Sequence, residues 1–157
     1  MSDLLEAHVV RCPYHLAQRF LYDSISEFAE SGEQRPLTLT APGPGMELTK
    51  GVMVSFGPAA DPMHFDQPWR IHWKPRSRLY PEFEGELTVR ADETYETSRL
   101  ELRGSYQPPG GIAGAVFDLA AGAHIASATA QALLHRIGDE MVARYEHDER
   151  AKRDRTT

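Results

Sequence analysis

The spacing of apolar residues changes once along this chain, at Pro108-Pro109-Gly110-Gly111. Before that segment, apolar and polar residues alternate in several short runs, which is the period of a β-strand with one buried face. After it, apolar residues recur every three or four positions as far as Tyr145, which is the period of an amphipathic helix. The pattern therefore predicts a sheet followed by one long helix that covers its buried face.

Four runs ahead of the Pro-Gly segment carry the strand period. Their apolar positions are Val52, Val54 and Phe56, then Trp69, Ile71 and Trp73, then Phe83, Leu87 and Val89, and finally Leu100 and Leu102. Polar residues fill the alternate positions, as they do in an antiparallel sheet with one wet face. Further upstream, residues 5–11 predict a short strand and residues 14–29 a helix. Residues 37–40 predict a brief strand, and Ala41 to Gly45 a loop.

The apolar stripe of the predicted C-terminal helix is uneven along its length. Small residues occupy its first half: Ala123, Ala126, Ser127 and Ala130. Large residues such as Leu134 and Met141 occupy its second half. Small residues let a helix lie close to a sheet, or they leave a space that a ligand fills, and the pattern alone leaves both possibilities open. Gly122 is a point at which the segment could divide into two helices.

Length and charge indicate how many domains the chain forms and which classes of partner it disfavours. The 157 residues predict one domain, spanning residues 1–148, and the mixed charges of residues 149–157 predict a disordered tail. The 17 basic and 23 acidic side chains give a net charge of -6, which disfavours nucleic acid as a partner. No run approaches the ~20 apolar residues that cross a bilayer, and the N-terminus lacks the pattern of a secretory leader. With a single cysteine, Cys12, the chain needs no oxidising compartment, so we expect a cytoplasmic protein.

No pattern in the sequence predicts a metal, nucleotide or cofactor site. The seven histidines lack the spacings that close a metal site, and the Pro-rich glycine loops lack a phosphate-binding frame. Nothing around Cys12 lowers the pKa of a thiol, so we expect a small buried side chain there. Glu82, Glu84 and Glu86 alternate with Phe83 and Leu87, which places these carboxylates on the wet face of the sheet.

The order of the predicted elements and four stretches of sequence resemble the START-like superfamily, also called SRPBCC or helix-grip. The stretches are Tyr80 to Leu87, Leu102 to Gly111, Phe117-Asp118 and Gly122 to Ala126. They are similar to bacterial polyketide cyclase/dehydratase and lipid-transport proteins, and the resemblance covers nearly the whole chain. It implies an α+β fold in which a curved antiparallel sheet grips a long C-terminal helix, with a cavity between them for a small apolar ligand. It implies no shared catalytic residue, because members of one fold carry different chemistries.

The inward positions of the strands and of the first half of the helix are the candidate walls of that cavity. They are Trp69, Ile71, Trp73, Phe83, Leu87, Leu100, Leu102, Tyr106, Ala123, Ala126, Ser127 and Ala130. Each of them taken alone is also a plausible core residue.

Three functions remain open at this point. The first is a carrier or sensor of a small hydrophobic molecule such as a lipid or polyketide. The second is a cyclase, aromatase or hydratase acting on such a molecule, for which His72, Tyr80, Tyr106 and His124 are the ionisable candidates. The third is a protein-interaction module that uses the loops at residues 41–45 and 59–67. An entirely apolar cavity would favour the carrier, and a buried histidine or carboxylate with a perturbed pKa would favour the enzyme. An interior filled by side chains would favour the protein-interaction module.

The charge pattern of the last two strands predicts how they pair. If Asp92-Glu93 form a two-residue turn, Glu86 lies opposite Arg99 and Glu82 opposite Arg103, with Phe83 opposite Leu102 on the other face. Asp-Glu does not favour the positive φ angles of such a turn, so a longer loop competes with it. A slip of one residue would bury charge, whereas a slip of two would keep the charged residues on the outer face and change their partners.

Overall fold

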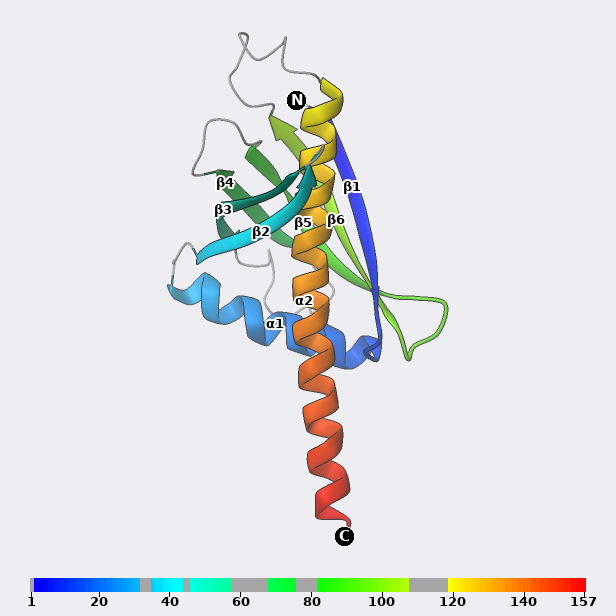
Figure 1. Cartoon of the computed structure of the whole chain (residues 1–157). Coiled ribbons are helices and arrows are strands. Elements are labelled where there is room, and N and C mark those ends of the chain that lie inside the picture. The colour runs from blue at the N-terminus through cyan, green and yellow to red at the C-terminus, as the bar shows by residue number, and fades with distance from the viewer. Residues whose placement is uncertain (1, 32–34, 44–45, 58–67, 76–81, 108–118) are drawn as a thin grey trace.

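The computed structural model describes residues 2–31, 35–43, 46–57, 68–75, 82–107 and 119–157. These described residues form six strands and two helices (Figure 1). In chain order these are β1 (Ser2–Val10), α1 (Tyr14–Ser31), β2 (Arg35–Gly43), β3 (Met46–Gly57), β4 (Trp69–Pro75), β5 (Glu82–Ala91), β6 (Ser98–Gln107) and α2 (Leu119–Arg155). The predicted α+β class, with a sheet followed by one long C-terminal helix, is confirmed.

The strands form one antiparallel sheet in the order β1-β6-β5-β4-β3-β2. The first two strands of the chain therefore lie at its two edges. The loop predicted at Ala41 to Gly45 is wrong in part, because β2 continues to Gly43 and Pro42 pairs with Glu47 of β3. Proline lacks the N–H that an inner strand must donate, but an edge strand such as β2 tolerates it.

The long helix α2 lies between the two edges of the curved sheet, where it contacts both β1 and β2 (Figure 1). Its fully buried residues, which include Ala126, Ala130, Leu133 and Leu134, face the concave side of the sheet. An unpaired strand edge invites pairing with other chains unless something covers it. A single helix here covers the edges and the concave face together.

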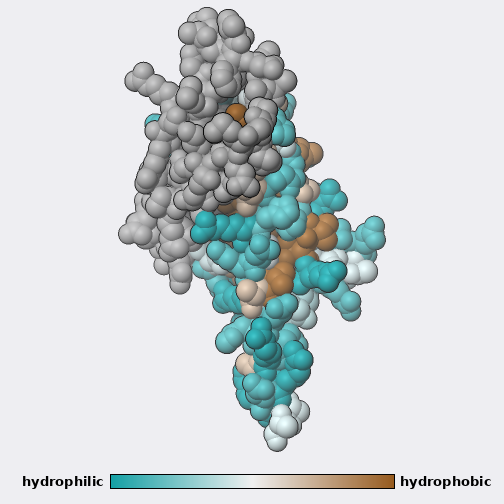
Figure 2. All heavy atoms as spheres, viewed as in Figure 1, coloured by the Kyte–Doolittle hydropathy of each residue, from teal (hydrophilic) through white to brown (hydrophobic). Residues whose placement is uncertain are grey.

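The helix is longer and less divided than the sequence predicts. It runs without interruption through Gly122 and continues past Tyr145 to Arg155, so the segment predicted to be a disordered tail is helical up to that residue. Ion pairs support this last part, with 3.9 Å between Arg150 Nη2 and Glu146 Oε2 and 3.1 Å between Lys152 Nζ and Glu149 Oε1. Basic residues in the last turn also suit the negative end of the helix dipole. The surface of this projecting part is hydrophilic (Figure 2).

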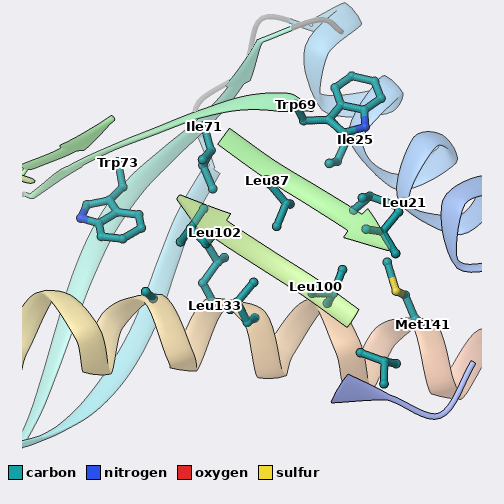
Figure 3. Packing of buried hydrophobic residues seen from close by; sticks show 14 of the residues in the cluster. Leu21, Ile25, Trp69, Ile71, Trp73, Leu87, Leu100, Leu102, Leu133 and Met141 are labelled. Atoms are coloured by element: carbon teal, nitrogen blue, oxygen red, sulfur yellow. The ribbon is translucent and has the colours of Figure 1, made fainter. Parts of the chain in front are cut away.

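The core lies between the concave face of the sheet, α2 and α1 (Figure 3). The amphipathic helix α1 contributes Phe20, Leu21 and Ile25, which are at most 3% exposed. Figure 3 shows Trp69 of β4 beside Ile25, while Trp73 lies towards the other end of the same strand. Because side chains alternate between the two faces along β4, β5 and β6, the predicted inward residues of all three strands lie in a single core.

The β5–β6 hairpin keeps the predicted faces but not the predicted register. Glu86 lies opposite Arg103 rather than Arg99, and Phe83 lies opposite Tyr106 rather than Leu102. The two-residue turn is therefore wrong. The partners shift by an even number of residues, which leaves every side chain on its predicted face.

A six-residue loop takes the place of the tight turn, from Asp92 to Thr97. The Asp92 N–H donates to the Thr97 carbonyl oxygen at 3.1 Å, and the Thr97 hydroxyl donates to the Asp92 carboxylate at 3.3 Å. At the tip, the Tyr95 carbonyl accepts a 2.9 Å hydrogen bond from the N–H of Tyr14, the first residue of α1. The loop thus satisfies a donor at the start of that helix, which a two-residue turn could not reach.

Two glycines lie opposite each other in the middle of β5 and β6. A Cβ atom on Gly85 would lie 2.3 Å from the Arg103 carbonyl oxygen, and one on Gly104 would lie 2.3 Å from the Glu84 carbonyl oxygen. The Phe83 ring lies over both glycines, with its Cζ atom 2.6 and 2.7 Å from the same two Cβ positions. The pair gives the sheet a recess that the ring fills.

Candidate ligand-binding site

The strand residues predicted as cavity walls all lie on the concave side of the sheet and are buried. Trp73, Phe83, Leu87, Leu100 and Leu102 are 0% exposed. Ile71, Trp69 and Tyr106 are at most 6% exposed. No water molecule could touch the first five, so in this structure they pack against each other and against α2.

Aromatic rings hold the two ends of this interior. Trp73 and Phe83 stack with their ring centroids 4.2 Å apart and an angle of 18° between the rings, which is a favourable offset geometry. At the other end, Trp69 meets the Tyr22 ring of α1 at 5.7 Å.

The first half of α2 supplies the small side chains of the interior. Ala126 and Ala130 are fully buried, whereas Ala123 and Ser127 are partly exposed. At Ala126 and Ala130 the helix lies close to the sheet, which is the first of the two predicted consequences of small residues. A space for a ligand beside these residues stays a prediction.

The ionisable candidates for catalysis are mostly directed away from this interior. His72 lies on the outer face of β4, where its Nε2 is 2.7 Å from Glu82 Oε1. His124 is exposed on α2, and Tyr80 lies outside the described residues. Tyr106 is the candidate on the concave side, and it is 6% exposed. Glu84 and Glu86 are exposed, as predicted for the wet face.

A polar seam between β1 and α2 was not predicted from the sequence. The Glu6 carboxylate accepts hydrogen bonds from the Ser127 hydroxyl and from the Gln131 side-chain amide. The His8 ring stacks on the His135 ring, with 3.9 Å between centroids. We call these five residues the β1–α2 seam.

Two signals in the sequence point to the seam. Glu6 and His8 alternate with exposed Leu5 and Val9, which gives them the inward parity of buried Leu4 and Val10. Ser127, Gln131 and His135 follow at intervals of four, which places them along one side of a helix. Gln131 also donates to the Ala7 carbonyl oxygen at 3.4 Å, so the seam covers part of the β1 edge.

An open hollow of about 600 Å³ lies on the outer face of the sheet. Asp3, Leu5, Glu84, Arg103 and Ser105 line it from outward positions. Charges of both signs suit a solvated groove better than a site for an apolar molecule. This hollow is on the opposite side of the sheet from the predicted walls.

Cys12 is fully buried, and burial raises the pKa of its thiol to about 11. We expect the folded protein to resist thiol reagents at pH 8, because only about one molecule in a thousand then carries the reactive thiolate and the sulfur is inaccessible. A coloured disulfide reagent added with and without denaturant measures this. Fast labelling of the folded protein would contradict the assignment of Cys12 as a core residue.

Among the residues that the structure describes, no group of three His, Cys, Asp or Glu side chains could hold a metal ion. Within the same part of the chain, no helix is long and apolar enough to span a bilayer.

No family model and no curated protein matches the sequence. Among solved structures, TTHA0849 from Thermus thermophilus is 12% identical, with a TM-score of 0.54 over 90% of this chain and 98% of its own. The Zhui aromatase/cyclase from Streptomyces sp. R1128 is 14% identical, with a TM-score of 0.49 over 91% of this chain and 94% of its own. Likeness at this level of identity concerns the fold alone. The helix-grip fold that the sequence resemblance implies is confirmed.

Proposed function

We propose that this chain binds a small hydrophobic molecule, such as a lipid or a polyketide, between the concave face of the sheet and the first half of α2. The supporting observation is the chemistry of the inward positions. On β4 these are Trp69, Ile71 and Trp73, and on β5 and β6 they continue as apolar residues, glycines, Ser98 and Tyr106. An apolar interior with few polar groups is typical of sites for apolar ligands.

Binding requires the interior to open. Ala126, Trp73 and Phe83 are closed to water, so a ligand must part these side chains to reach the space beside α2. The small side chains of α2 support this, because Ala126 and Ala130 fill less of the space between the helix and the sheet than larger residues would. Ala123 and Ser127, which are partly exposed, mark the end at which opening begins.

Carriage or sensing fits this interior better than catalysis. General acid–base chemistry needs an ionisable group near the reacting atoms. Among the described inward residues of β1, β4, β5 and β6 the ionisable ones are Glu6, His8 and Tyr106, and Glu6 and His8 are engaged in contacts with α2. The proposed site lies within a single domain of residues 1–148, which we place in the cytoplasm.

Native mass spectrometry of freshly purified protein tests this function directly, because a tightly held apolar molecule appears as an added mass. A fluorescent apolar dye then gives a dissociation constant. We expect Ala126→Phe to weaken dye binding at least tenfold, or about 1.4 kcal/mol, because the new ring occupies the proposed site. Ala143→Phe is the matched control, since it adds the same ring at an exposed position of the same helix.

Circular dichroism shows whether the Ala126→Phe variant still folds, because overpacking a closed core costs about 1–3 kcal/mol. Ala123→Phe, at a partly exposed position, repeats the test with less strain. The proposal fails if the wild-type protein shows neither an adduct nor dye binding, or if folded Ala126→Phe and Ala123→Phe both bind the dye as the wild type and the Ala143→Phe control do.

A further inference from the structure

The β1–α2 seam joins an edge of the sheet to the helix that closes it. On β1 the seam residues are Glu6 and His8, and His8 pairs across the sheet with apolar Leu100 of β6. On α2, Gly138 allows the close approach, because a Cβ there would lie 3.0 Å from His8 Cδ2 and 3.0 Å from Val10 Cγ2. The His8 ring thus lies between the His135 ring and the backbone of α2.

Hydrogen bonding fixes the state of the exposed partner of this pair. His135 Nδ1 is 2.7 Å from the Gln131 carbonyl oxygen, which can only accept, so Nδ1 carries the proton. The neutral ring therefore has an unprotonated Nε2. A proton added at that atom would make His135 a cation stacked on His8.

The charges around His8 oppose a proton on its own ring. Burial, and next the neighbouring His135, lower the pKa of His8, while Asp139 raises it. Glu6, on the same strand, is already bonded to Ser127 and Gln131. On β6, Arg99 and Glu101 flank Leu100 and pair with each other at 3.3 Å on the outer face. Among the residues that the structure describes, Asp139 is the carboxylate that counteracts the repulsion between two protonated rings.

We propose that the His8–His135 pair is a proton-sensitive latch, in which stacked neutral rings hold β1 against α2 and protonation parts them and opens the seam. Resting on the proposed function, the open seam is the route by which the apolar ligand leaves the interior. The sign follows from linkage. His8 binds a proton more weakly in the closed seam than in the open one, because its pKa in the closed seam is lowered from the ordinary value of 6.5. Protonation therefore favours the open seam as the pH falls below 6.5.

Hydrogen exchange measured at about pH 7.5 and about pH 5.5 tests the latch without any ligand, once rates are expressed as protection factors. We expect protection of the β1 amides to fall about tenfold relative to that of the β5 amides in the same molecule, since one proton changes an opening equilibrium by up to about tenfold per pH unit. His8→Phe keeps a stacked ring but cannot be protonated, so it should abolish this relative loss. His147→Phe is the control, because it removes an exposed histidine of α2 beyond the seam.

The latch is overturned if β1 and β5 lose protection in parallel, or if His8→Phe leaves the pH response unchanged. His135→Phe repeats the test should His8→Phe fail to fold. Dye release over the same pH range tests whether the ligand leaves through the seam. If the protein retains the dye at acidic pH while the β1 amides lose protection, the seam is not the exit. A wild-type protein that binds no dye at about pH 7.5 refutes the proposed function, and the exchange data still decide the latch.

Discussion

Replacing Gly104 with alanine will lower the free energy of unfolding by about 3 kcal/mol or more, at the upper end of what overpacking costs. The new Cβ would lie 2.3 Å from the Glu84 carbonyl oxygen and 2.5 Å from the Gly85 Cα atom. Both are backbone atoms of β5, so neither can yield without breaking the pairing of β5 with β6. Gly85→Ala meets the backbone of β6 in the same way and should behave alike.

Urea denaturation monitored by circular dichroism measures this loss, and Gly122→Ala is its matched control. A Cβ on Gly122 would meet nothing within 4 Å, and alanine is the better helix former, so that variant should be neutral or more stable by up to about 1 kcal/mol. Equal stability of Gly104→Ala and the wild type would mean that β5 and β6 do not approach as closely as described.

Trp73→Ala will cost about 3–5 kcal/mol of stability, the range for removing a large buried aromatic side chain. The ring is 0% exposed and stacks on Phe83. Phe83 lies in the recess over Gly85 and Gly104, so it has little freedom to fill the space that Trp73 leaves. The loss should therefore include the full cost of a cavity.

The same variant also reports on ligand binding. If a ligand enters by moving the Trp73 ring, its removal should leave dye affinity unchanged or raise it, since apolar cavities in proteins accept small apolar molecules. Tyr95→Ala, at a side chain that is 77% exposed, should change stability by less than about 0.5 kcal/mol. Thermal melts and dye titrations of both variants give these values. A small stability loss for Trp73→Ala would show that its packing is looser than the structure indicates.

The inside and outside of the sheet could be predicted because alternation has a period of two. Trp69, Ile71 and Trp73 can only share a face, whatever strand lies beside them. The pairing partners could not be predicted in the same way. The β5–β6 register depends on the six-residue loop, and that loop is held by a hydrogen bond to Tyr14, some eighty positions away in sequence.

Residues whose role depends on α2 were harder to predict. Glu6 and His8 are polar, so a reading by hydropathy places them in water, and only the inward parity of Leu4 and Val10 suggests otherwise. They face the interior side because Ser127, Gln131 and His135 supply polar partners there. For the candidate wall residues, burial could be predicted from their apolar side chains. Whether they fill a core or line a cavity could not, because the same side chains suit both.

The position of α2 between β1 and β2 also determines when this fold can be completed during synthesis. The five strands β2 to β6 can begin to pair in chain order as they leave the ribosome, but β1 has no neighbour until β6 appears, nearly one hundred residues later. Both edges, and the part of the concave face that α1 does not cover, stay uncovered until the first half of α2 has emerged. Contacts this distant in sequence slow folding and prolong the exposure of strand edges. We therefore expect nascent chains of this protein to depend on chaperones more than a helical bundle of equal length does.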